Sequence, residues 1–194
     1  MTVAVRQLTM AELEAGLEHI RRSPQDRGRL AEIVRRPATG VREVVEHGEL
    51  DLAKGLVGDN WGTRGSRSMP DGSADRDMQL NVMNARVADL VAQDRKRWQL
   101  AGDQLFVDFD LSETNVPAGT RLTIGSAVIE VTPPPHTACA KFVLQFGVDA
   151  MKFVNSPTGQ ALHLRGVNAK VVRSGVIRVG DAVTKQERSR NQEP

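Results

Sequence analysis

The residues best suited to chemistry lie in one short stretch, PPPHTACAKF, at positions 133–142. It holds the single cysteine of the chain, Cys139, with His136 three residues before it and Lys141 two residues after it. A thiolate is a nucleophile and a ligand for soft metals, and a nearby cation lowers the pKa of a thiol. Cys139 is therefore a candidate nucleophile or metal ligand, tuned by His136 or Lys141. The alternative is that this cysteine is only a small buried apolar residue.

The elements on either side of this stretch must position the thiol. AVIEVT, 127–132, has the pattern of a strand, and AKFVLQFGVDAMKFV, 140–154, has Phe and Ala at helical spacing with a break near Gly147. The three prolines between them stiffen the connection. If the helix begins near Ala138, its free N–H groups would stabilise a thiolate or an anion at this point.

The remaining elements favour a mainly β protein with inserted helices, an α+β fold. Thr9 and Glu12 have the spacing of a capping box at the start of a helix, and Ser156–Pro157 begins a short helix that runs to about Leu162. The pattern predicts strands at 30–37, 105–111, 120–125 and 127–132, extended pieces over 41–61, a strand and then a helix over 78–94, a hairpin at 167–181, and a long exposed loop at 62–77. Strands and helices do not alternate regularly, which favours a β-barrel or open sandwich over a doubly wound sheet.

Composition limits the classes of partner. The chain has 194 residues, a net charge of +2 and 26% charged residues, so it lacks the basic footprint of a nucleic-acid-binding or membrane-surface protein. Short basic runs such as Arg35–Arg36 are expected to be solvated surface. One cysteine fits a reducing compartment, and the N-terminus has no apolar signal-peptide region. We expect a cytoplasmic protein with neither nucleic-acid nor membrane partners.

An ordered series of segments resembles one known family. GLVGD at 55–59, the segment from AGDQLFVDFDL to PPPHTACAKF at 101–142, and LRGVNAKVVRSGVIRVGDAV at 164–183 together resemble the MOSC domain, the C-terminal domain of molybdenum-cofactor sulfurases. The resemblance covers roughly residues 48–184. It implies a MOSC-type β-barrel over 48–184, with a short helix and strand extension packed on it over 1–47. The polar residues 185–194 are expected to form a disordered tail.

The resemblance also implies a function for the lone thiol. In this family Cys139 would ligate molybdenum of a pterin cofactor, or carry sulfur as a persulfide. The implied catalytic residues are Cys139 and His136, and the implied metal ligand is Cys139. A phosphate-bearing pterin needs polar and basic side chains. The candidates for binding it are Asn84, Arg86, Thr137, Asn155, Arg165 and Asn168.

Several functions stay open at this point. The first is a molybdenum-cofactor-dependent reductase of N-hydroxylated compounds, which would receive electrons from a separate protein because the chain shows no iron–sulfur, flavin or nicotinamide motif. The second is a sulfur carrier served by a sulfur-donor protein, and the third is a non-catalytic module that binds an anion or a partner. A Cys–His hydrolase is a fourth option, although no third group is evident to orient His136. No pyridoxal phosphate site is expected.

Overall fold

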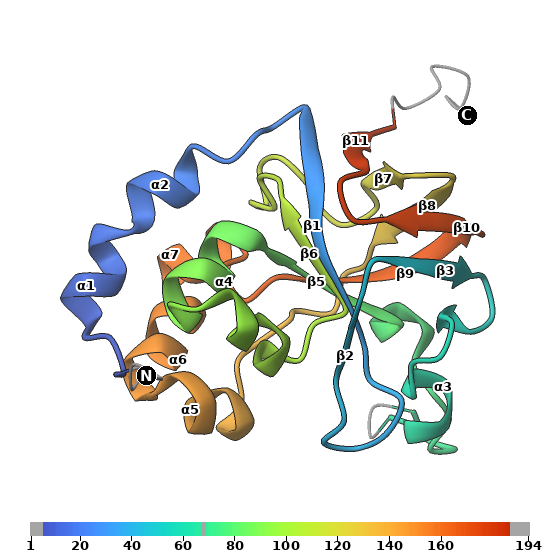
Figure 1. Cartoon of the computed structure of the whole chain (residues 1–194), viewed down its shortest axis with the longest axis horizontal. Coiled ribbons are helices and arrows are strands. Elements are labelled where there is room, and N and C mark those ends of the chain that lie inside the picture. Colours follow the sequence, from blue (N-terminus) through green and yellow to red (C-terminus); the bar gives the residue numbers. More distant parts are fainter. Residues whose placement is uncertain (1–5, 67–68, 187–194) are drawn as a thin grey trace.

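Seven strands close into a β-barrel in the part of the chain that the structure describes, residues 6–66 and 69–186 of a computed structural model (Figure 1). Around the barrel the order is β1, β11, β7, β8, β9, β5 and β6, and β6 pairs again with β1. Their bounds are β1 Arg27–Arg35, β5 Leu80–Asn84, β6 Leu105–Asp108, β7 Arg121–Ile124, β8 Ala127–Val131, β9 Val167–Arg173 and β11 Ala182–Lys185. Only the β5–β6 pair is parallel among these. The expected mainly β barrel with helices is thus confirmed.

Shorter strands extend one side of the barrel. β2, Glu43–Val45, pairs with the end of β1, and a small sheet has the order β10, β3, β4. These three strands span β3 His47–Asp51, β4 Gly55–Leu56 and β10 Gly175–Arg178. All of the pairs in this region are antiparallel.

Most of the helices gather on the opposite side, at the left in Figure 1. They are α1 Met10–Ala15, α2 Leu17–Arg21, α4 Ala85–Ala92, α5 Ala140–Phe146, α6 Val148–Asn155 and α7 Pro157–Ala161; α3, Trp61–Arg64, lies near the small sheet, and two 3₁₀ turns span η1 Arg76–Met78 and η2 Arg95–Ala101. Thr9 and Glu12 form the expected capping box, Ser156 caps α7, and Gly147 separates α5 from α6. None of the described helices is long and apolar enough to cross a membrane.

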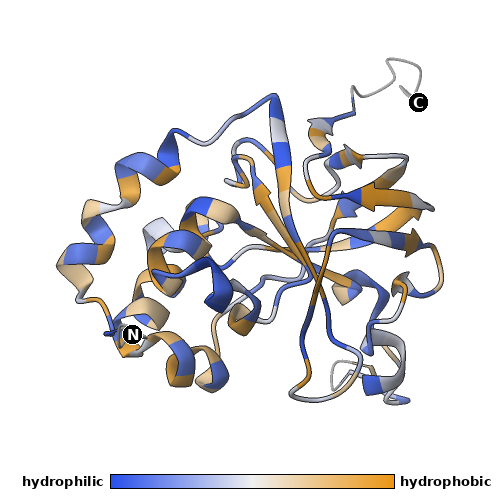
Figure 2. Ribbon diagram, viewed as in Figure 1, coloured by the Kyte–Doolittle hydropathy of each residue, from blue (hydrophilic) through white to orange (hydrophobic). Residues whose placement is uncertain are grey.

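The barrel strands have an apolar core on each side. One core fills the barrel interior, where Leu105, Val107 and Phe109 are fully buried. The other lies between the barrel and the helices, where Phe106 packs with apolar residues that include Phe142 of α5. Figure 2 shows apolar residues along the central strands. The helices therefore cover Phe106 on the second face of β6, whereas Asp108 on the same face stays 39% exposed.

The prediction that residues 167–181 form a hairpin was wrong. β9 pairs with β8 along one edge and with β5 along the other, whereas β10 pairs with β3. A strand has only two edges, and β9 uses both inside the barrel. The Ser174 turn therefore directs the chain out of the barrel instead of folding β10 back onto β9.

The ends of the fold differ from the expected division of the chain. β1 belongs to the barrel itself instead of to an extension packed on it. β11 runs to Lys185, one residue into the expected tail, and residues 187–194 lie outside the described residues. The segment 62–77, expected to be a loop, contains most of α3 and the first residues of η1. Residues 67–68 lie outside the described residues.

Candidate functional site

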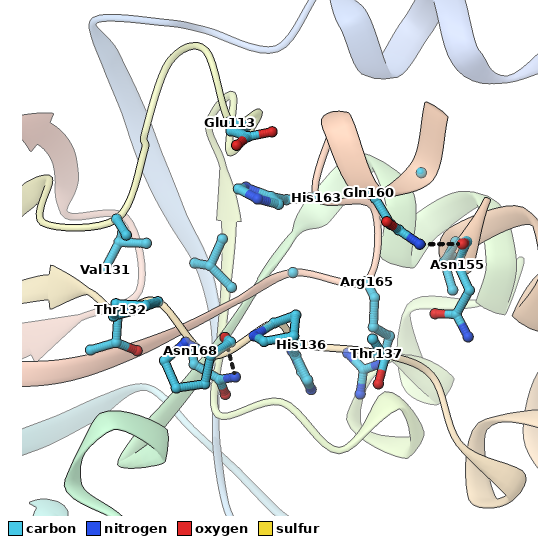
Figure 3. A pocket seen from close by; sticks show the side chains of 18 residues that line it. Glu113, Val131, Thr132, His136, Thr137, Asn155, Gln160, His163, Arg165 and Asn168 are labelled. Atoms are coloured by element: carbon cyan, nitrogen blue, oxygen red, sulfur yellow. Dashed lines mark hydrogen bonds between the residues drawn. The ribbon is translucent and has the colours of Figure 1, made fainter. Parts of the chain in front are cut away.

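A pocket of about 370 Å³ lies between the end of β8, the proline-rich segment after it, the α6–α7 region and the start of β9. Figure 3 shows its side chains. The lining residues are Glu113, Ala118, Val131, Thr132, Pro133, Pro134, Pro135, His136, Thr137, Val154, Asn155, Gly159, Gln160, His163, Arg165, Gly166, Val167 and Asn168. The pocket thus brings together five residues predicted for the site: His136, Thr137, Asn155, Arg165 and Asn168. Its volume lies within the range of small-molecule sites, which begins at about 300 Å³.

Two close contacts, one of the backbone and one of a side chain, fix the walls of the pocket. Gly166 has a φ of +101°, and a Cβ atom there would lie 2.3 Å from the carbonyl oxygen of Val82 in β5. Only glycine allows this approach. On the other wall, Asn168 Nδ2 donates to the carbonyl oxygen of Pro134 at 2.9 Å. The proline segment is therefore fixed to β9 by a buried amide side chain.

A buried ionic cluster forms one side of the pocket. Arg165 Nη1 donates to Asp103 Oδ2 at 2.7 Å, and Nη2 donates to the carbonyl oxygen of Ala101 at 2.8 Å. His136 Nδ1 lies 3.5 Å from the other carboxylate oxygen, Oδ1 of Asp103. Within the described residues, three buried atoms here lack a hydrogen-bond partner: His136 Nδ1, Asp103 Oδ1 and Arg165 Nε. Such orphaned polar atoms mark a place where a bound polar molecule would be stabilised.

The same cluster sets the protonation of His136. Burial, and then the positive charges of Arg165 and Arg36, lower the pKa of His136 well below its ordinary value of 6.5. Burial also raises the pKa of Asp103, and Arg165 opposes that rise. His136 is therefore neutral near pH 7. It does not supply the cation that the sequence led us to expect beside Cys139.

A second buried ion pair supports this wall from behind. Arg36 and Asp59 form a bidentate pair, with Nε–Oδ2 at 2.8 Å and Nη2–Oδ1 at 3.0 Å, and their side chains are only 5% and 1% exposed. Arg36 Nη1 also donates to Asn81 Oδ1, and Asn81 Nδ2 donates to Asn168 Oδ1 at 2.7 Å. The expectation that Arg36 lies on the solvated surface was wrong, because the carboxylate of Asp59 and the oxygens Asn81 Oδ1 and Gly102 O satisfy its buried charge.

Cys139 stands just outside the pocket. It is exposed and precedes α5, which begins at Ala140, and its side chain makes no capping hydrogen bond. The residue before it is held firmly, since Ala138 N donates to Asn155 Oδ1 at 2.9 Å and Asn155 Nδ2 donates to Ala138 O at 3.1 Å. The alternative of a buried bystander does not describe this thiol. Lys141 is exposed as well.

Asn84 and Arg86 lie away from this pocket. Asn84 caps α4 by accepting from Arg86 N at 2.8 Å, and its Nδ2 donates to Ser23 Oγ and to Phe109 O. Arg86 pairs with Asp108, Nε–Oδ1 2.7 Å, and lines a separate hollow of about 390 Å³. Asn84 and Arg86 thus make contacts within the fold, and neither of them is among the residues that line the pocket.

Sequence reasoning missed three residues that shape the pocket: Asp103, Glu113 and His163. Asp103 follows Gly102 and precedes the apolar run of β6, a context with no sign of full burial. His163 has a φ of +46°, and its Nδ1 lies 2.6 Å from the carbonyl oxygen of Leu111. Only its rarity, as one of four histidines, could have drawn attention to it.

The donor set bears on whether a metal would fit. No group of three or more His, Cys, Asp and Glu side chains that could hold a metal ion occurs among residues 6–66 and 69–186. Cys139 and His136 also share no hydrogen bond there. A metal at Cys139 would thus need most of its ligands from a bound organic group. A thiolate beside a polar pocket fits a metal that arrives already chelated, and it does not fit a free ion.

Comparison with known proteins defines the family. A model of the MOSC domain matches residues 72–184, more than half of the chain. No curated protein matches the chain significantly.

Solved structures share the fold. The YuaD protein from Bacillus subtilis has a TM-score of 0.56 at 14% identity, over 84% of this chain and 97% of its own. YiiM from Escherichia coli has a TM-score of 0.53 at 20% identity, over 83% of this chain and 71% of its own. A crystal structure described as a hypothetical protein has a TM-score of 0.56 at 21% identity, over 84% of this chain and 69% of its own. The chain belongs to the MOSC domain family.

Proposed function

We propose that this protein binds a molybdenum cofactor, with the Cys139 thiolate as a ligand of the metal and the pocket as the site of the organic part. The observation that carries this proposal is the position of the thiol. Cys139 is exposed, and it follows a residue, Ala138, that two hydrogen bonds with Asn155 fix at the pocket wall. A soft thiolate beside a polar cavity suits a chelated, soft transition metal.

The pocket residues would hold such a group by hydrogen bonds. Thr137 offers a hydroxyl and Arg165 an unpartnered Nε–H, and neutral His136 offers one ring nitrogen as a donor or acceptor. The Asp103 carboxylate keeps Arg165 in place. Asp103 largely balances the charge of Arg165, so the pocket would hold the pterin ring by hydrogen bonds more than by charge.

A bound molybdenum centre would supply two-electron redox chemistry, and N-hydroxylated compounds are the proposed substrates. The residues of the chain would bind and orient the reactants, and a separate electron-donor protein would complete the system. The exposed position of Cys139 leaves that region open to such a partner. This assignment extends beyond family membership and depends on the metal.

The test is elemental analysis of protein purified from a host that makes the cofactor. We expect near-stoichiometric molybdenum in the wild type and its loss in Cys139→Ala. Lys141→Ala is the matched control, because Lys141 is exposed on the same segment and should leave the metal in place. Well-folded wild-type protein without molybdenum would contradict the proposal.

A sulfur carrier is the second candidate, favoured by the same exposure. A persulfide on Cys139 could be passed to a partner protein only if the sulfur is accessible, and it is. Mass spectrometry of protein purified with a sulfur-donor system would then show one added sulfur atom on Cys139 and no stoichiometric molybdenum. If neither metal nor persulfide is found, the chain is better described as a non-catalytic binding module.

A further inference from the structure

One end of the pocket differs from the ionic cluster described above. Figure 3 shows the Glu113 carboxylate beside the His163 ring at this end, with Thr137, Arg165 and His136 on the opposite side. Glu113 is anchored by its backbone, because its N–H donates to the carbonyl oxygen of Ala161 at 3.0 Å. Within the described part of the chain, its carboxylate takes part in no hydrogen bond or ion pair. It is a hydrogen-bond acceptor with both oxygens available.

The conformation of His163 is unusual and well fixed. Its φ of +46° lies in the left-handed region, which non-glycine residues seldom adopt. Two backbone hydrogen bonds hold the turn, from His163 N to Gln160 O at 3.1 Å and from Gly166 N to His163 O at 2.7 Å. Strained residues that the surrounding structure holds in place cluster at ligand sites.

The ring of His163 has a defined tautomer. A carbonyl oxygen only accepts, so the Nδ1 atom that lies 2.6 Å from Leu111 O must carry the proton. In the neutral ring, Nε2 then has the free lone pair. His163 and Glu113 therefore place acceptors side by side at this end of the pocket, while Arg165 and Thr137 offer donors elsewhere in it.

We propose that Glu113 and His163 recognise the 2-amino-4-oxopyrimidine edge of a pterin. This edge has two parallel N–H donors, from the amino group and the neighbouring ring nitrogen, and a carboxylate accepts such a pair with both oxygens. Nε2 of His163 adds an acceptor beside it. The choice of a pterin rests on the proposed function and deepens it. The other end of the pterin then faces the Thr137 side, from which the chain runs on to Cys139.

The test uses metal-free protein and free pterin, whose fluorescence reports binding. The comparison ligand is lumazine, which has an oxygen in place of the 2-amino group. One lost hydrogen bond to a charged group corresponds to about a tenfold change in affinity or more. We expect pterin to bind the wild type at least about tenfold more tightly than lumazine.

Variants assign this preference to the two side chains. Glu113→Gln should abolish the preference for pterin over lumazine, and Glu14→Gln, the same charge change on exposed α1, should retain it. His163→Asn keeps a residue that tolerates positive φ and should weaken both ligands while Glu113 still discriminates between them. Equal binding of the two ligands by the wild type, or an unchanged preference in Glu113→Gln, would overturn the proposal.

Guanosine provides a last arm, because guanine shares this edge. If guanosine displaces pterin only at concentrations well above that of pterin, the result supports the pterin assignment. If guanosine binds more tightly than pterin, the result overturns it. Molybdenum content is measured separately. Loss of the pterin preference would thus leave the metal test of the proposed function intact, and absence of molybdenum would leave the binding test intact.

Discussion

The two sides of the pocket contrast in how their polar groups are satisfied. On the inner side, Arg165, Asp103 and Asn168 are buried and bonded to one another, to the backbone or to neighbouring amides. On the outer side, Glu113 and Cys139 are exposed, and their side chains have no bonded partner among the described residues. The comparison teaches that the inner groups mainly fix the shape of the pocket and keep only single atoms, such as Arg165 Nε, for a ligand, whereas the side chains of the outer groups are free to contact one. Substitutions should therefore affect stability on one side and binding or reactivity on the other.

The largest effect is expected at the ion pair behind the inner wall. Asp59→Asn leaves the buried Arg36 guanidinium without its counter-charge, which should lower the free energy of unfolding by about 3–5 kcal/mol. Urea denaturation measures this change. Glu43→Gln breaks the Arg35–Glu43 pair, whose side chains are 39% and 45% exposed, and should cost at most about 1 kcal/mol. Equal losses in the two variants would contradict the contrast.

A smaller effect is expected at Asn168. Asn168→Ala removes the hydrogen bonds to Pro134 O and from Asn81, and leaves buried polar groups unsatisfied. The expected loss is about 1–3 kcal/mol, again measured by urea denaturation. Because the proline segment would lose its tie to β9, pterin affinity should fall as well. Full stability in this variant would show that the pocket wall does not depend on this amide.

The pH dependence of stability tests the neutral state of His136. Its pKa is lowered on folding, so its contribution is fully present above the unfolded pKa of about 6.5 and is lost as the pH falls through 6.5 toward the folded pKa. The slope is at most about 1.4 kcal/mol per pH unit for one proton. We expect His136→Gln to flatten the stability curve between pH 6.5 and the onset of carboxylate titration. Parallel curves for wild type and variant would contradict this.

The smallest effect on stability is expected at Cys139. Cys139→Ala removes an exposed side chain and should change the free energy of unfolding by no more than about 0.5 kcal/mol. In the native wild type this thiol should react with a disulfide reagent as fast as it does in denaturant. A marked lag before reaction would place Cys139 on the inner side of the contrast.

Local patterns in the sequence predicted most of the elements but not their long-range partners. The Thr9–Glu12 capping box and the helix break near Gly147 are read from nearby residues, and both occur in the structure. The pairing of β9 with β5 and β8 depends on which edges are already occupied, and no local signal carries that information. The burial of Arg36 likewise depends on Asp59, 23 residues away.

The candidate site was predictable in part for the same reason. Thr137 lies within the proline–cysteine segment and Asn155 ends α6, and the resemblance to a known family pointed to both. Glu113 and His163 come from turns whose places depend on Ala161 and Leu111. Their meeting is a product of tertiary packing, which periodicity and spacing do not encode.

The seam between β1 and β11 has a consequence for how the protein is made. These two strands are the first and last of the barrel in the chain, and they pair from Arg27–Thr184 to Arg29–Ala182. During synthesis on the ribosome, the barrel cannot close until the final strand has emerged. Until then, the edges of β1 and β7 stay open to pairing with other chains. The nascent protein therefore depends on rapid completion, or on a chaperone, to pass from an open sheet to a closed one.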